Sequence, residues 1–268
     1  MKHNIKFVKK QKLKEIKKIK KSFAPDLLRS ATQFVSGELR SLQVHIKQSE
    51  KFVVIPELKS KLYPENIYFD NFHLVEFARK FEQMGLDSAL VVSIDATFLG
   101  GDPSWINLAK NNTDLPIIAR DFFVDPIQVY QAKSIGADGI FLEDKYTTQE
   151  IMKSMIGSAL ELGLECYLKI EQTKIDELIE YKGVTGYFLD LNTPLDNHEI
   201  LRSLRNILKE DSLLFAIMFP KSFDELKFLE QLGCNGVILN NEFLRQHDIF
   251  NTFKQLMLWR DEMTNKDE

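Results

Sequence analysis

The sequence has no long apolar run and few residues that bind metals or form disulfides. About 20 consecutive apolar residues are needed to span a bilayer, and no stretch of the 268 residues approaches that. No apolar core follows the N-terminal charges, so we expect no secretory signal. The two cysteines, Cys166 and Cys234, lie in apolar, strand-like runs without metal-ligand spacing. We therefore expect two buried thiols in a cytoplasmic protein with no transmembrane segment.

Cofactor and metal motifs are also missing. The sequence has no GxGxxG, no phosphate-binding P-loop and no histidine pair at ligand spacing. We expect neither a cofactor nor a metal. The histidines are scattered, and none falls at the end of a predicted strand: His3, His45, His73, His198 and His247.

Charge is distributed unevenly along the chain. The formal net charge is -4, yet residues 2 to 21 carry ten lysines and a single glutamate, Glu15. Apolar residues recur there at helical spacing, which predicts a basic amphipathic helix. Its lysines are either the solvated face of a helix that caps the domain or a docking element for a membrane surface, a nucleic acid or a protein partner. Because arginine and interleaved aromatics are lacking, we expect no nucleic-acid partner.

Short β-branched runs alternate with amphipathic segments, a pattern typical of a parallel sheet with helical crossovers. Three crossovers end in Gly-x-Asp or Gly-x-Asn, at 85–87, 136–138 and 233–235, where glycine fits the left-handed position after a helix. This repeat indicates a barrel. We predict an α/β fold, a (β/α)8 TIM barrel over 49–268, after an N-terminal helical extension over 1–48. Strands are predicted over 52–58, 89–94, 116–119, 139–142, 166–170, 186–189, 213–218 and 236–239, and helices over 71–84, 126–135, 148–162, 197–209, 223–232 and 249–263.

Three motifs resemble one enzyme family. FLGG at 98–101, RDFFVDPIQ at 120–128 and GADG at 136–139 resemble indole-3-glycerol phosphate synthase, and the resemblance extends over about residues 48 to 262. It implies a (β/α)8 barrel with its chemistry at the C-terminal ends of the strands. It also implies the ring-closing decarboxylation and dehydration of a carboxyphenylamino-deoxyribulose phosphate in tryptophan biosynthesis.

The resemblance assigns candidate catalytic residues. Glu57 and Lys59 match an Ala-Glu-x-Lys motif that binds and polarises the substrate, and as alternate strand residues they face the same side. Arg120 stands where the family has its catalytic lysine, and an arginine is a poor proton donor. Lys169 stands where the family has the glutamate base, and Glu171 is a possible replacement for that base.

The resemblance also assigns candidate substrate-binding residues for a small anionic or aromatic ligand. Asp95 lies near the family's acidic position, and Phe98 lies in the well-matched loop. Asn192 matches an Asn-x-Arg-like motif if one residue is inserted. Asn240 and Asn241 follow the last strand, where the family binds phosphate. Before them, a Met-Phe-Pro turn at 218–220 replaces the family's Glu-Ser-Gly turn, and proline has no amide to donate.

Glu143 and Asp144 stand where the family has an apolar wall. This pair either repels an anionic substrate or faces the surface.

Three functions stay open at this point. The chain is a synthase-family enzyme, impaired or diverged, because each lost catalytic group typically costs about 10²–10⁴ in rate. Alternatively, it is a non-catalytic homologue that acts as a binding or regulatory protein. In the third, Lys169 forms a Schiff base, which requires burial to lower its pKa. The plainer expectation is an ion pair of Lys169 with Glu57 or Glu171.

Overall fold

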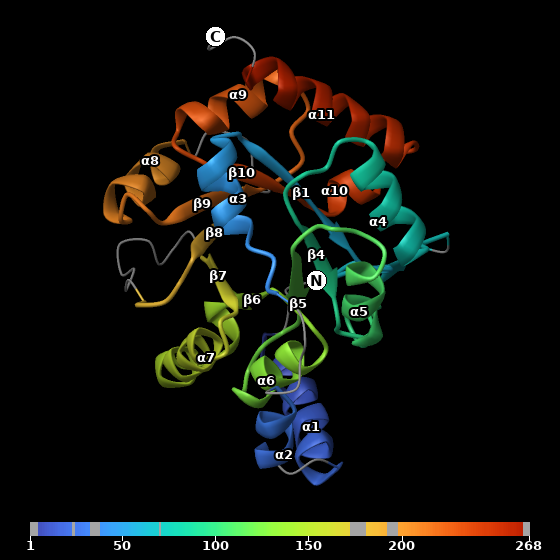
Figure 1. Ribbon diagram of the computed structural model, residues 1–268, viewed down its shortest axis with the longest axis vertical. Helices are drawn as coiled ribbons and strands as arrows, with labels where there is room; N and C mark the ends of the chain where they lie inside the picture. The colour runs from blue at the N-terminus through green and yellow to red at the C-terminus, as the bar shows by residue number, and fades with distance from the viewer. Residues whose placement is uncertain are drawn as a thin grey trace.

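Eight parallel strands close into a barrel in the computed structural model, which describes residues 5–22, 25–32, 38–69, 71–171, 181–191 and 198–264 (Figure 1). β1 closes the ring by pairing with β4 on one side and β10 on the other. The predicted (β/α)8 barrel is therefore confirmed. The strands are β1 (Val53–Leu58), β4 (Leu90–Ser93), β5 (Ile117–Arg120), β6 (Gly139–Glu143), β7 (Glu165–Ile170), β8 (Gly186–Asp190), β9 (Leu213–Ile217) and β10 (Gly236–Leu239).

Helices surround the barrel and follow its strands (Figure 1). Six of them match the predicted ranges to within three residues at each end, although residue 197 lies outside the described residues. These are α4 (Leu74–Gln83), α6 (Ile127–Ser134), α7 (Gln149–Glu161), α8 (His198–Ile207), α9 (Phe223–Gln231) and α11 (Ile249–Thr264). The elements without a predicted counterpart are short: the ribbon β2 (Lys61–Leu62) and β3 (Ile67–Tyr68), α5 (Ser104–Lys110), the 3-10 turn η2 (Asp144–Tyr146) and α10 (Asn241–Leu244).

The N-terminal extension covers both ends of the barrel. α3 (Leu42–Ser49) buries Leu42 and Ile46 against the apolar interior of the barrel. α1 (Ile5–Ser22) buries Val8 and Ile16 at the opposite end, against the loops that follow the strands. α2 (Pro25–Ala31) lies beside α1 and packs along α6.

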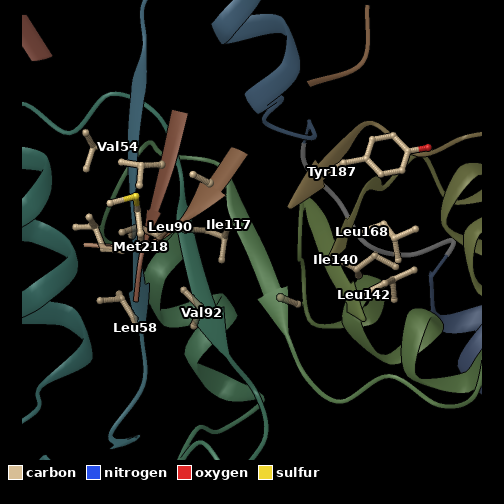
Figure 2. Close-up of a cluster of buried hydrophobic side chains, with 14 of the residues drawn as sticks. Val54, Leu58, Leu90, Val92, Ile117, Ile140, Leu142, Leu168, Tyr187 and Met218 are labelled. Carbon is tan, nitrogen blue, oxygen red and sulfur yellow. The ribbon is translucent and has the colours of Figure 1, made fainter. Parts of the chain in front are cut away.

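Alternation along the strands divides the core into two layers, because successive side chains point to opposite faces of a sheet. Inside the barrel, aromatic rings fill the space: the Phe188 ring lies 4.6 Å from Phe141 and 5.3 Å from both Tyr167 and Phe215, centroid to centroid. A second layer packs between strands and helices. Figure 2 shows part of this outer cluster, which includes Val54, Leu90, Val92, Ile117, Ile140, Leu142 and Leu168.

The three predicted glycine turns adopt the left-handed conformation, with φ of 93° at Gly85, 90° at Gly136 and 83° at Gly233. In two of them the polar residue that ends the motif ties the strand that follows it to a neighbouring strand. The side chains of Asp138 and Asn235 each accept a hydrogen bond of 2.9 Å from a backbone N–H at the start of the neighbouring strand. The repeated motif is thus a device that ends a helix and anchors a strand.

Both cysteines are free and buried, as the sequence predicts. Burial raises the pKa of the Cys166 and Cys234 thiols to about 12. Among the described residues, no helix has the length and apolar character that a membrane crossing requires.

Gly101 tests how tightly the loop after β4 is packed. A methyl group there would overlap the backbone carbonyl of Ser93, which belongs to the strand itself. We expect Gly101→Ala to lower the free energy of unfolding by about 1–3 kcal/mol, as overpacking does. Urea unfolding of the purified variant measures this change.

Gly157→Ala is the matched control, because an added methyl group there meets nothing within 4 Å in the middle of α7. We expect this variant to gain about 0.5–1 kcal/mol, since alanine favours the helix. Equal effects of the two substitutions would contradict the close approach at Gly101.

Candidate active site

Charged side chains gather at the mouth formed by the C-terminal ends of the strands. Glu57 and Lys59 come from the end of β1, Arg120 from β5, Glu143 from β6 and Lys169 from β7. Three of these groups are almost fully buried, with Lys59 5%, Arg120 8% and Glu143 3% exposed. Charges this deep need partners, because desolvation of an ion costs several kcal/mol.

Glu57 and Lys59 form the pair that their alternation predicts. Lys59 Nζ donates to Glu57 Oε2 at 2.5 Å. The other oxygen of Glu57 lies 3.8 Å from Arg120 Nε. The pair therefore joins a larger network rather than standing alone.

Arg120 is fixed on several sides. Its Nη2 donates to Glu143, and its Nη1 donates to the backbone carbonyl of Asp121 at 2.9 Å. The guanidinium carbon also lies 4.3 Å from the centroid of the Phe141 ring. Burial by itself would lower the pKa of Arg120, but Glu143 and Glu57 outweigh it and raise that pKa above its ordinary value. The Arg120 side chain is therefore a permanent cation whose two terminal nitrogens are already engaged in hydrogen bonds.

Glu143 corrects both sequence expectations for its position. It neither faces the surface nor stands as a free negative charge, because it is buried between Arg120 and Lys145, whose Nζ lies 3.1 Å from Glu143 Oε2. Burial would raise the pKa of Glu143, yet Arg120, Lys169 and Lys145 together hold it well below its ordinary value. Tertiary pairing, which adjacent residues in the sequence do not reveal, neutralises this carboxylate.

Lys169 also differs from expectation. Its Nζ lies 2.6 Å from Asp190 Oδ2, at the end of β8, and the expected pairing with Glu57 or Glu171 was wrong. Burial opposes the charge, but Glu143 and Asp190 outweigh burial and raise the pKa of Lys169. The condition for a Schiff-base lysine, a lowered pKa, is not met.

Glu171 lies at the rim of the mouth. Its side chain is 39% exposed and lies 3.7 Å from Lys145 Nζ. Asn192, the other candidate from this part of the chain, lies outside the described residues.

Asp95 and Phe98 organise the loop after β4. The Asp95 carboxylate accepts backbone N–H donation from Phe98 at 2.6 Å and Leu99 at 2.9 Å. Phe98 packs edge-on against Tyr63 and Phe122, at centroid distances of 5.4 and 5.3 Å. These aromatic rings make an apolar wall beside the charged network.

Lys12 is the site residue that sequence analysis missed. It projects from α1 and is 4% exposed, with Nζ 2.9 Å from Asp95 and 2.6 Å from Asp121. Burial opposes its charge, but Asp121 and Asp95 outweigh burial and raise the pKa of Lys12 well above its ordinary value. A signal existed in the sequence: Lys12 lies midway between the buried Val8 and Ile16 at intervals of four residues, so all three share one helix face.

Asn240 and Asn241 hold loops together in this structure. The Asn240 side chain accepts from the Glu242 backbone N–H at 3.0 Å and caps α10. Asn241 Nδ2 donates to the Tyr63 carbonyl at 3.0 Å and to Glu65 at 3.2 Å. A phosphate contact would have to compete with these hydrogen bonds.

The mouth is close to electrically neutral as a whole. Its five cations face six carboxylates, and each cation has a carboxylate oxygen within 4 Å. An anionic ligand would therefore displace an existing ion pair to reach a cation. The cations are Lys12, Lys59, Arg120, Lys145 and Lys169, and the carboxylates are Glu57, Asp95, Asp121, Glu143, Glu171 and Asp190.

Known proteins share both sequence and fold with this chain. A family model described as indole-3-glycerol phosphate synthase matches residues 5–256. The chain is similar to indole-3-glycerol phosphate synthases from Alkaliphilus metalliredigens, with 25% identity over 82% of this chain and 85% of that protein, and from Legionella pneumophila strain Paris, with 24% identity over 92% and 96%.

Solved structures show the likeness of fold. (S)-3-O-geranylgeranylglyceryl phosphate synthase from Thermoplasma acidophilum matches with a TM-score of 0.56 and 14% identity, over 84% of this chain and 100% of that one. A structure described as "Native KDPGal structure" matches with a TM-score of 0.55 and 15% identity, over 80% of this chain and 94% of that one.

Replacing Lys12 tests whether α1 is part of the mouth. We expect Lys12→Met to lower the free energy of unfolding by about 3–5 kcal/mol, because it leaves two buried carboxylates without their cation. Lys14→Met is the control, since Lys14 is exposed on the same helix and exposed substitutions usually stay within about 0.5 kcal/mol. Urea unfolding of both variants measures the two changes in the free energy of unfolding, and equal changes would refute the role of Lys12.

The Glu143 carboxylate predicts a pH dependence. Because its pKa is lowered in the folded state, its stabilisation is complete above the pKa of a glutamate in the unfolded chain and falls as pH drops below it. We expect the stability gap between wild type and Glu143→Gln to be constant from about pH 7 to pH 5 and to narrow by up to about 1.4 kcal/mol per unit below about pH 4.5. Urea titrations across this range measure it, and a gap that widens in acid would contradict the assignment.

Proposed function

Because the chain belongs to the indole-3-glycerol phosphate synthase family, we propose that its mouth is a diverged form of that family's active site in which ring closure is impaired. The observation that supports this proposal is the buried Arg120–Glu143 ion pair, because the sequence resemblance puts the family's catalytic lysine at position 120. The reaction concerned is the decarboxylation and dehydration of a carboxyphenylamino-deoxyribulose phosphate.

Proton donation is the first step affected. A general acid works best when its pKa lies near the operating pH. The pKa of Arg120 is raised above an already high value, and its donors are engaged with Glu143 and a backbone carbonyl. Arg120 can stabilise negative charge but is a poor source of the proton that a departing oxygen needs.

Proton removal is affected two strands away, at the end of β7. A general base needs a free lone pair, and Lys169 is held protonated beside Asp190. Glu171 has an accessible carboxylate, but it stands at the rim and pairs with Lys145. The proposed mouth therefore keeps the polarising pair Glu57 and Lys59 without a matched acid and base.

A non-catalytic role as a binding or regulatory protein is the second candidate. The self-neutralised mouth favours it, because the family substrate carries a phosphate and a carboxylate that would have to break existing ion pairs. Phe219 supports it too, since its ring packs against Phe243 at a centroid distance of 6.0 Å, where the family has its phosphate-binding turn.

A reversion series tests the proposal. The four-residue variant carries Arg120→Lys, Glu143→Leu, Lys169→Glu and Asp190→Asn. Changing Glu143 frees the new amine from its carboxylate, and changing Asp190 prevents two carboxylates from meeting at the 2.6 Å separation of the present pair. Indole formation is followed by fluorescence in a single turnover, with enzyme in excess over the ribulose phosphate substrate.

We expect the wild type to form product at least about 10²-fold more slowly than the four-residue variant, the usual effect of a missing acid or base. Glu57→Gln in both backgrounds is the control and should abolish product. A wild type as fast as the variant would refute impairment. Calorimetry that shows no substrate binding to either protein, together with no product, would favour the non-catalytic candidate.

A further inference from the structure

The outer face of α1 carries a continuous row of lysines. Lys6, Lys10, Lys14, Lys17 and Lys21 follow one another at intervals of three or four residues, so they lie along one side of the helix. All five are exposed. With a rise of 1.5 Å per residue, the row runs for roughly 22 Å. It lies opposite the buried face on which Lys12 reaches the barrel mouth.

This row is not neutralised within the described part of the chain. The ion pairs made by α1 belong to other lysines: Lys12 pairs with Glu15, Asp95 and Asp121, and Lys20 pairs with Asp125. Lysines spaced three or four residues apart on a helix repel one another and destabilise it. Repulsion among these lysines thus destabilises α1, no ion pair of the described residues relieves it, and an anionic partner would.

The position of the lysine row and the side chains around it suit contact with a flat surface such as a membrane. α1 and α2 lie at one end of the long axis of the molecule, away from α9 and α11 (Figure 1). Exposed apolar side chains accompany the lysines at this end, with Phe7 50%, Leu13 39% and Leu27 64% exposed. Lysines with nearby Phe and Leu side chains are the features of helices that rest on lipid headgroups.

Charge asymmetry would orient the molecule. α1 carries nine lysines and one glutamate, although the whole chain has a net charge of -4. An anionic surface therefore attracts α1 and repels the rest of the protein. α1 contains no arginine, the residue that reads bases and phosphates through its planar fork.

We propose that the lysine row of α1 docks this protein on an anionic lipid surface. The inner face of the helix stays packed on the barrel, so docking is electrostatic, with Phe7 and Leu13 at the headgroup boundary. Clusters of four to eight basic residues on such helices bind anionic lipid, and each lysine contributes about 1 kcal/mol, or about fivefold in affinity. This inference does not depend on the proposed function.

Vesicle co-sedimentation tests the proposal with the full-length protein. The vesicles contain either phosphatidylcholine alone or equal parts phosphatidylcholine and phosphatidylserine. We expect wild type to bind only the anionic vesicles, with an affinity that falls as salt rises. The variant Lys6→Gln, Lys10→Gln, Lys14→Gln, Lys17→Gln should bind more than about a hundredfold more weakly.

The matched control removes the same charge elsewhere. Lys47, Lys153, Lys182 and Lys254 are exposed on other parts of the chain, and we expect their joint replacement by glutamine to leave vesicle binding unchanged. Because the row lysines are exposed and repel one another, their replacement should keep or raise the melting temperature, which excludes unfolding as a cause.

Three results would overturn the proposal. Wild type fails to bind anionic vesicles more tightly than neutral ones. The control variant loses as much binding as the row variant. A single-stranded oligonucleotide binds wild type more tightly than the anionic vesicles do and depends on the same four lysines, which would assign the row to nucleic acid.

Discussion

A buried charge must be matched by an opposite charge, and the barrel mouth of this protein is built around that constraint. Burying an unpaired ion destabilises the folded state by several kcal/mol, which is more than most single interactions stabilise it. Lys12 neutralises the carboxylates of Asp95 and Asp121 and thereby attaches α1 to the barrel. Arg120 and Glu143 neutralise each other at the centre of the mouth. Because the pairs share neighbours, moving one of them disturbs the loops after several strands.

The same pairing holds the two cations on which the proposed function rests. Arg120 lies beside Glu143, and Lys169 lies beside Asp190. Each of these cations thus has a carboxylate partner of its own, which offsets the cost of desolvating it. The aromatic wall of Tyr63, Phe98 and Phe122 packs beside these pairs.

α1 connects this mouth to the surface of the molecule. One face of the helix places Lys12 among the carboxylates, and the other carries the exposed lysine row. A helix of 18 residues can serve both because positions four apart share a face, whereas positions two apart lie on nearly opposite faces. One helix thus carries both the exposed lysine row and the cation that pairs with Asp95 and Asp121.

Local patterns in the sequence were enough to predict the barrel. Strand order, helix order and the glycine turns follow from alternation and chain reversal, which depend on neighbouring residues. The Glu57–Lys59 pair follows from the two-residue period of a strand. The resemblance to the synthase family located the correct strand ends as well.

The partners of the charges could not be predicted in this way. Asp95 lies 83 positions from Lys12, Glu143 lies 23 from Arg120 and Asp190 lies 21 from Lys169. Which of several carboxylates a cation meets depends on barrel register and on side-chain reach, and a change of one strand position exchanges the partner. The sequence by itself determined the elements, their order and the family. Only the tertiary structure decided which charges are buried together, because ion pairing acts through space between strand ends that closure of the barrel brings together.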